Sequence, residues 1–134
     1  MTFQGKIIYV GSSNFAGWNI AQANERAHNR SIIGTVSEQT KYNLLSRLPE
    51  LELIPVCREY GVGLLPYSPL ARGALAGAPG TKTGGRRDEI APNEERDRKL
   101  AEFVRLSREL GAPPAAIAIR WLLYNPVVVA PLIG

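Results

Sequence analysis

The chain has 134 residues, of which 45% are hydrophobic and 21% are charged, and its formal net charge is +4. This length and composition are typical of one globular domain or part of one, and they exclude a low-complexity or disordered chain. The sixteen basic side chains are scattered among twelve acidic ones, so the positive charge does not indicate a nucleic-acid-binding face.

The numbers of cysteine and histidine residues and the lengths of the apolar runs restrict the class of protein further. Cys57 and His28 are the only residues of their types, which excludes an internal disulfide and leaves no set of zinc ligands. No apolar run approaches the roughly 20 residues that span a bilayer, and Met1–Gly5 lacks the apolar core of a signal peptide. We therefore expect a cytoplasmic protein with no metal, no membrane partner and no nucleic-acid partner.

The first half of the chain contains two strand-like runs, each followed by a helical stretch. A β-branched run over Lys6–Val10 predicts a strand, and a helix is predicted from about Trp18 to Ala27. A second strand is predicted around Ile32–Val36. The short helix that follows has one apolar face, made of Leu53, Val56, Cys57 and Tyr60. Gly61 is expected to end this helix.

A third strand-like run follows directly. Val62–Pro66 is almost continuously apolar, as expected for a parallel strand that is covered on both faces. Tyr67–Gly73 is rich in turn residues, and Ala76–Ala91 predicts an extended loop because it is rich in Gly, Pro, Thr and charge. The third unit therefore consists of a buried strand and a long connection.

Two helices and a last strand complete the pattern. Asn93 is expected to cap a helix with Glu residues in its first turn. The predicted buried face of this helix is Leu100, Phe103, Val104 and Leu110. After Gly111, a second helix is predicted from about Pro114 to Tyr124 and a fourth strand over Val127–Ala130.

Strands that alternate with helices predict an α/β fold with parallel strands, either as an open sheet or as a barrel. A (β/α)8 barrel typically needs about 250 residues, so four β/α units in this length correspond to about half of one. Four parallel strands alone would have two unpaired edges and an exposed apolar inner layer. We expect such a chain to need a covering partner.

Three segments, taken together and in this order, resemble aldo/keto reductases. They are Gly5–Trp18 (GKIIYVGSSNFAGW), Ser37–Leu45 (SEQTKYNLL) and Gly63–Gly73 (GLLPYSPLARG). Trp121–Gly134 resembles the helix and eighth strand of that family, and the match is weakest over Ala78–Ala91. The resemblance covers essentially the whole chain, residues 1–134. It implies the C-terminal half of a (β/α)8 barrel in an NADPH-dependent oxidoreductase that reduces aldehydes or ketones.

The resemblance also implies a cofactor site. Ser13, Asn14 and Gln39 match residues that hydrogen-bond the nicotinamide carboxamide in that family, and Tyr67 matches the aromatic residue that stacks on the nicotinamide ring. The loop that wraps the pyrophosphate is matched by Ser68, Pro69, Leu70 and Arg72. Backbone N–H groups and a guanidinium suit a doubly anionic bridge.

Each of these residues has a simpler interpretation when the resemblance is set aside. Ser13 and Asn14 would form a turn or a helix cap, Tyr67 would be a packing aromatic, and Arg72 would be a solvated charge. Among the other candidates, His28 is expected to be exposed and Cys57 to be a buried, unreactive thiol. Trp18 and Trp121 are expected to be packing residues and not site residues.

The four residues that carry proton transfer in the family, a Tyr, a Lys, an Asp and a His, come from the first four strands. No motif for them occurs here, so no catalytic residue is assigned. The loop that contacts the adenosine 2′-phosphate is not present either, so NAD is a second candidate cofactor beside NADP. The carbonyl substrate cannot be read from this sequence.

Three hypotheses of function follow. The chain is part of a complete reductase without activity of its own, a non-catalytic nicotinamide-nucleotide-binding or regulatory module, or a half barrel that associates with another half. The partner in the last case is a second copy in a homodimer or a complementing N-terminal half.

Overall fold

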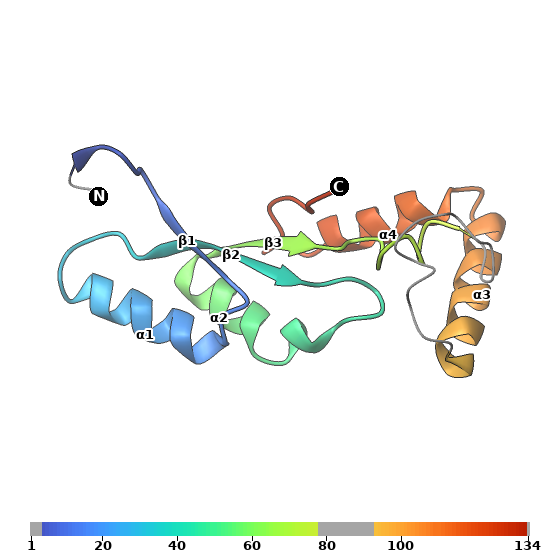
Figure 1. Cartoon of the computed structure of the whole chain (residues 1–134), viewed down its shortest axis with the longest axis horizontal. Helices are drawn as coiled ribbons and strands as arrows, with labels where there is room; N and C mark the ends of the chain where they lie inside the picture. The colour runs from blue at the N-terminus through green and yellow to red at the C-terminus, as the bar shows by residue number, and fades with distance from the viewer. Residues whose placement is uncertain (1–3, 78–92, 134) are drawn as a thin grey trace.

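The computed structural model describes residues 4–77 and 93–133. The elements are β1 (Val10–Ser13), α1 (Gly17–His28), β2 (Thr35–Lys41), the 3-10 turn η2 (Leu48–Glu50), α2 (Leu53–Tyr60), β3 (Gly63–Tyr67), α3 (Glu94–Glu109) and α4 (Pro114–Leu123). The strands form one parallel sheet in the order β1-β2-β3 (Figure 1). The predicted alternation of parallel strands and helices is confirmed. Most of the predicted loop Ala76–Ala91 lies outside the described residues.

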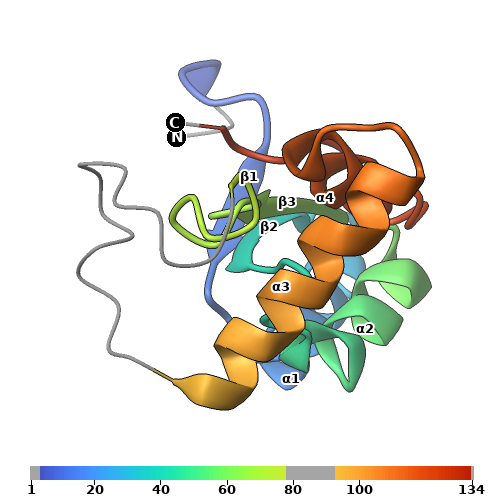
Figure 2. The ribbon, with the colours of Figure 1, turned by 90° about the vertical axis from the view of Figure 1, so that its right-hand side faces the viewer.

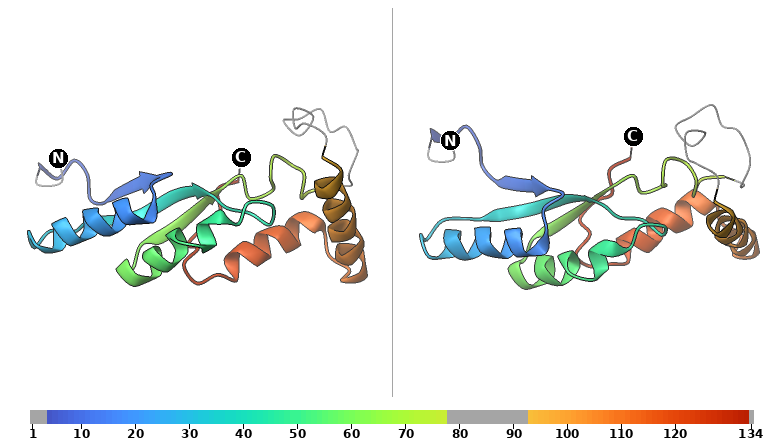
Figure 3. Two further views of the ribbon diagram at one scale, coloured as in Figure 1. Left: turned by 90° about the horizontal axis from the view of Figure 1, so that it is seen from below. Right: turned by 60° about the horizontal axis from the view of Figure 1, so that its bottom comes forward.

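Helices α1, α2 and α4 lie on one side of the sheet (Figure 3). Leu64 of β3 is completely buried between the sheet and these helices, and it shares a core cluster with Ile20, Cys57 and Leu122. Helix α3 lies across one end of the molecule (Figure 2), where Leu100 belongs to a second, smaller cluster. No helix among the described residues has the length and hydropathy needed to cross a bilayer.

The register of the sheet aligns the carboxyl ends of the strands. Ser13 of β1 pairs with Gln39 of β2, and Lys41 at the end of β2 pairs with Tyr67 at the end of β3. Strand β1 lies close to β2 at Gly11, where a Cβ atom would lie 2.4 Å from the Ser37 Oγ atom and 3.1 Å from the Ser37 carbonyl oxygen, so a larger residue would require Ser37 to move. The polar residues that follow the strands are therefore brought to one edge of the sheet.

The first two strands begin later in the chain than the apolar pattern predicts. We expected them at Lys6–Val10 and around Ile32–Val36, but β1 begins at Val10 and β2 at Thr35. Val10 pairs with Thr35, so the residues before Val10 have no part of β2 to pair with. The apolar side chains of residues 7–10, 32 and 33 are exposed. Backbone pairing, and not apolarity alone, determines where these strands start.

The predicted fourth strand, Val127–Ala130, runs beside β3 without forming a continuous ladder. Two isolated parallel bridges join Leu64 to Val128 and Tyr67 to Leu132. The Leu64 N–H donates to the Val127 carbonyl at 2.8 Å, and the Leu132 N–H donates to the Pro66 carbonyl at 2.8 Å. Proline residues interrupt both sides of this pairing, because neither Pro66 nor Pro131 has an N–H group to donate.

The helix ends follow the local signals in the sequence. Gly61 ends α2 with a left-handed φ of 64°, and the Asn93 side chain accepts a hydrogen bond from the Arg96 N–H at the start of α3. The prediction for Leu110 is wrong, because Leu110 is 72% exposed. It lies one residue beyond the last helical residue of α3, where the chain turns toward Gly111.

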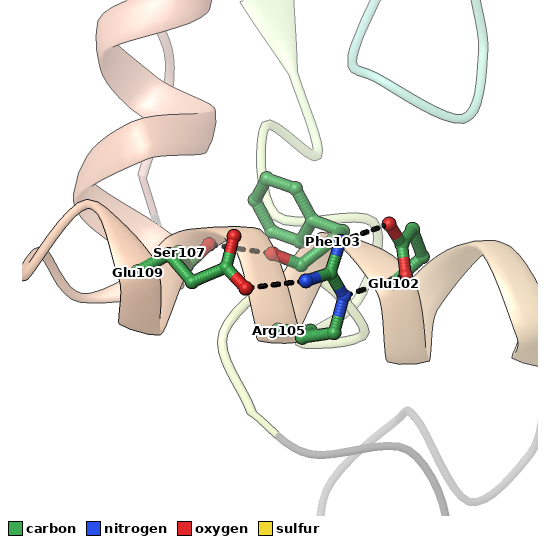
Figure 4. A network of polar contacts seen from close by, with 5 residues as sticks. All are labelled: Glu102, Phe103, Arg105, Ser107 and Glu109. Carbon is green, nitrogen blue, oxygen red and sulfur yellow. Dashed lines mark hydrogen bonds and ion pairs between the residues drawn. The ribbon is translucent and has the colours of Figure 1, made fainter.

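The outer face of α3 is charged and its inner face includes a buried hydroxyl (Figure 4). Arg105 forms ion pairs with Glu102 and Glu109, while the Ser107 Oγ atom donates to the Phe103 carbonyl at 2.7 Å. Ser107 is 1% exposed, so it lies on the buried face of α3, where we had expected Leu110 to lie. The charged outer face of α3 is thus solvated.

The buried thiol of Cys57 gives a first testable expectation. Burial raises the pKa of Cys57 to about 11, and the carboxyl of Glu38 adds to the increase. At about pH 8 the folded chain should alkylate with iodoacetamide about 100-fold more slowly than the chain in concentrated urea, since two pKa units separate the thiolate populations.

The same shift makes a prediction for stability. A raised pKa means that the folded state favours the protonated thiol. The contribution of this thiol to the free energy of unfolding is therefore complete below the unfolded pKa of 9.0, and it is lost as the pH rises to about 11. The Cys57→Ser variant should lack this component of the pH dependence. Equal alkylation rates in folded and unfolded protein would show that the thiol is not protected.

Candidate functional site

Four of the predicted cofactor residues meet at the carboxyl edge of the sheet. The Tyr67 hydroxyl donates a hydrogen bond to the Asn14 Oδ1 atom at 3.1 Å, which joins the end of β3 to the residue after β1. The Ser13 hydroxyl donates to the Gln39 carbonyl at 3.1 Å, and the Asn14 Nδ2 atom donates to the Ser13 Oγ atom at 3.3 Å. Residues up to 53 positions apart in the chain therefore form one polar group.

The arrangement leaves amide groups available to a ligand. The backbone N–H of Asn14 donates to the Gln39 carbonyl at 2.9 Å, so this hydrogen bond fixes the backbone of both residues and leaves their side chains to face a ligand. The Gln39 side-chain amide is half-buried and has no hydrogen-bond partner within residues 4–77 and 93–133. Together, the side-chain amides of Asn14 and Gln39 can offer both donors and acceptors to another amide.

Unusual backbone conformations are concentrated in the same region. Among the described residues other than glycine, five have positive φ, and four of these belong to the site segments: Asn14, Ser68, Ala71 and Arg72. Such conformations are costly for residues with a Cβ atom, and they occur preferentially at ligand-binding sites. This local strain supports a functional role for the turn after β1 and the loop after β3.

The loop after β3 lines a cavity of about 560 Å³. Ser68, Arg72 and Ile133 are among its lining residues. The Arg72 side chain is exposed and has no ion-pair partner among residues 4–77 and 93–133. Pro69 is buried and Leu70 packs against the second core cluster, so these two residues can offer a ligand mainly their backbone atoms.

The eight predicted cofactor residues thus form two neighbouring groups. Ser13, Asn14, Gln39 and Tyr67 are joined by hydrogen bonds, whereas the other four belong to the loop beyond Tyr67. No hydrogen bond or ion pair joins Arg72 to the first group in the described structure, but Tyr67 and Arg72 line the same cavity. A single extended ligand that passes from Asn14 along the edge to Arg72 would contact both groups.

Sequence reasoning missed three polar residues that shape this edge. Asn43 is 1% exposed, and its Nδ2 atom donates to the Ser68 carbonyl at 2.8 Å. Glu38 is buried beneath the turn after β1, and Glu52 accepts a hydrogen bond from the Trp18 N–H at the start of α1. Glu38 and Asn43 lie in a polar run, Ser37–Asn43, that follows the second predicted strand, and nothing in this run indicated that they would be buried.

The remaining candidates do not take part in the site. His28 is exposed and Cys57 is buried, both as predicted. Trp121 packs against Tyr42, with ring centroids 5.2 Å apart. The prediction that Trp18 is a packing residue is wrong, because its side chain is 62% exposed and lies outside the buried face of α1. The described residues contain no group of three or more His, Cys, Asp or Glu residues that could hold a metal ion.

A larger cavity, of about 830 Å³, lies on the helical side of the molecule between α2 and α4. Tyr42, Arg47 and Trp121 are among its lining residues. None of the predicted cofactor residues contributes to it. Its position on the outer, helical face separates it from the carboxyl ends of the strands, where parallel α/β folds place their ligands.

A parallel sheet covered by helices, with polar residues gathered at the carboxyl ends of its strands, is consistent with part of a (β/α)8 barrel. A model described as the aldo/keto reductase family matches residues 1–134. The chain belongs to the aldo/keto reductase family.

Individual relatives agree with this assignment. An uncharacterized oxidoreductase of Bacillus subtilis, YrpG, is 44% identical over 135 residues, which cover 97% of this chain and 40% of the relative. Versiconal hemiacetal acetate reductase of Aspergillus parasiticus is 33% identical over 131 residues, which cover 91% of this chain and 38% of the relative. The chain therefore spans about two fifths of the length of these curated relatives.

Proposed function

We propose that this chain is the nicotinamide-binding, C-terminal half of an oxidoreductase that reduces aldehydes or ketones with NADPH, and that NADH is the alternative cofactor. The observation that carries the proposal is the convergence of Asn14, Gln39 and Tyr67 at the carboxyl edge of the sheet. An amide group on the nicotinamide matches the amide donors and acceptors at this edge.

Each residue has a role in this proposal. Asn14 and Gln39 bind the carboxamide, and Ser13 holds the Asn14 amide in place through its hydroxyl. Tyr67 presents an aromatic face that limits how the nicotinamide ring can lie. Ser68 and Arg72 bind the pyrophosphate, with the guanidinium supplying positive charge. The cofactor supplies the hydride when it is bound, and this chain orients it and excludes water from one of its faces.

The proton donor of the reaction comes from outside this chain. A developing alkoxide in a dry pocket is costly unless an acid protonates it, and no residue at the described edge has been assigned that role. We therefore propose that activity requires the N-terminal half of the barrel. The exposed apolar side chains that precede β1, including Ile8 and Tyr9, are the surface that this half would cover.

Cofactor titration tests the binding proposal. Addition of NADPH should quench tryptophan fluorescence and enhance the fluorescence of the cofactor, with saturation in the micromolar to millimolar range. The isolated chain should not oxidise NADPH in the presence of a carbonyl compound, and it should gain that activity when the N-terminal half of a reductase of this family is added. Absence of binding at millimolar NADPH would exclude the proposal.

The same samples distinguish the remaining alternatives. Binding without any activity in the presence of the N-terminal half would favour a non-catalytic nucleotide-binding module. Light scattering that gives twice the mass of the chain would show that a second copy covers the β1 edge. A monomer that becomes a one-to-one complex with the added half is the result that we expect.

A further inference from the structure

A buried acidic side chain lies directly beneath the proposed nicotinamide-binding turn. Glu38 belongs to β2 and is 0% exposed. Its Oε1 atom accepts a hydrogen bond from the Phe15 N–H at 3.0 Å, and its Oε2 atom accepts one from the Ser12 hydroxyl. Both oxygens of the carboxyl group are therefore engaged, one by the end of β1 and the other by the turn that follows it.

The two partners of Glu38 lie on either side of the cofactor residues. Ser12 precedes Ser13 and Asn14 in the chain, and Phe15 follows them. The carboxyl group thus fastens both ends of a two-residue segment whose second member, Asn14, has a left-handed φ of 56°. A strained conformation of this kind persists only where the surroundings hold it.

Glu38 does not contact the site from the ligand side. It pairs in register with Ser12 on one strand and Leu64 on the other, and Leu64 belongs to the core between the sheet and the helices. Its neighbour Gln39 points to the opposite face, because successive side chains of a strand alternate. One strand therefore contributes a ligand-binding amide on one face and a support for the turn on the other.

We infer that Glu38 is a positioning residue, which holds Asn14 in the conformation that binds the nicotinamide carboxamide. This inference rests on the proposed function. Glutamate suits the task because it has two acceptors that can reach an O–H and an N–H at the same time. Glutamine can retain both contacts, by accepting from Phe15 and donating to the Ser12 hydroxyl, whereas alanine leaves the partly buried Phe15 N–H without this partner.

Comparison of two ligands separates a positioning role from a general role in folding. NADPH contains the nicotinamide, whereas 2′-phospho-ADP-ribose has the rest of the molecule and lacks it. In Glu38→Ala, the Kd for NADPH should rise about tenfold and the Kd for 2′-phospho-ADP-ribose should stay within about twofold, as expected when hydrogen bonds to one part of a ligand are lost. Glu38→Gln should stay within about threefold of the wild type for both ligands.

A matched variant controls for disturbance of the same strand face. Thr40 is the next buried residue on that face of β2 and its side chain makes no hydrogen bond to the turn, so Thr40→Val should leave both affinities unchanged. Equal weakening of both ligands in Glu38→Ala, or unchanged NADPH binding, would overturn the inference. Failure of Glu38→Gln to restore NADPH binding would also overturn the hydrogen-bonding argument.

Hydrogen exchange provides a readout that needs no cofactor. The Phe15 amide should be protected in the wild type and in Glu38→Gln, and it should exchange faster in Glu38→Ala. Faster exchange confined to residues 12–15 would show that Glu38 holds the turn locally. Faster exchange throughout the sheet would show that Glu38 has a purely structural role. A wild-type chain with a protected Phe15 amide that binds no NADPH would show that the proposed function fails, and the positioning role would fail with it.

Discussion

Replacement of Leu64 by alanine is expected to lower the free energy of unfolding of this chain by about 2 to 5 kcal/mol, the range for fully buried leucines. Leu64 is completely buried, and it belongs to the same core cluster as Ile20 of α1 and Leu122 of α4. Small domains have total stabilities of only about 5 to 15 kcal/mol, so this loss should leave a large unfolded fraction.

Urea denaturation followed by circular dichroism measures this effect. Leu51→Ala is the matched control, because it makes the same substitution at a position that is 80% exposed and should change the stability by about 0.5 kcal/mol or less. Similar losses for the two variants would mean that the core does not lie between β3 and the helices. The Leu64 variant should also lose the protection of the Cys57 thiol against alkylation, since both residues belong to the same cluster.

Replacement of Asn14 by glycine should weaken NADPH binding by about 10- to 100-fold while the chain stays folded. The loss corresponds to one or two hydrogen bonds to the carboxamide, each worth about 0.5 to 1.5 kcal/mol. Glycine is the informative substitution because it accepts the left-handed φ of 56° at this position, so only the side-chain amide is removed. The contact from the Tyr67 hydroxyl would also be lost.

Ser31→Gly serves as the control for this experiment. Ser31 also has a positive φ, of 52°, but it lies in the connection after α1, at a distance along the chain from all of the site residues. Its replacement should leave the Kd for NADPH unchanged. If both glycine variants bind NADPH as the wild type does, the Asn14 amide has no part in cofactor binding, and the proposed nicotinamide-binding site is wrong.

The extent of successful prediction differed between helices and strands. Helix ends were predicted well because their signals are local: Gly61 supplies a left-handed residue and Asn93 supplies a side-chain cap. Strand starts were predicted poorly, because a strand begins where a partner is available. Val10 pairs with Thr35, the first residue of β2. The apolar residues before Val10 therefore have no partner in β2 and stay outside the sheet.

Prediction of the candidate site showed the same difference between local signals and contacts between distant segments. The resemblance to a family identified Ser13, Asn14, Gln39 and Tyr67, and the structure brings these residues together; their role in binding a cofactor remains a prediction. Nothing in the local pattern indicated that Glu38 would be buried or that it would meet Ser12 and Phe15, which are more than 20 positions away. Such residues can be found only when the pairing of the strands is known.

The sequence by itself determined the family, the alternation of strands and helices, and the residue types at the carboxyl ends of the strands, since these depend on motifs and on short-range patterns. The tertiary structure alone decided where the strands start, that Leu110 is exposed, and that the Tyr67 hydroxyl reaches Asn14. The physical reason is that burial and hydrogen bonding between distant segments depend on the register of the sheet, which no single segment contains.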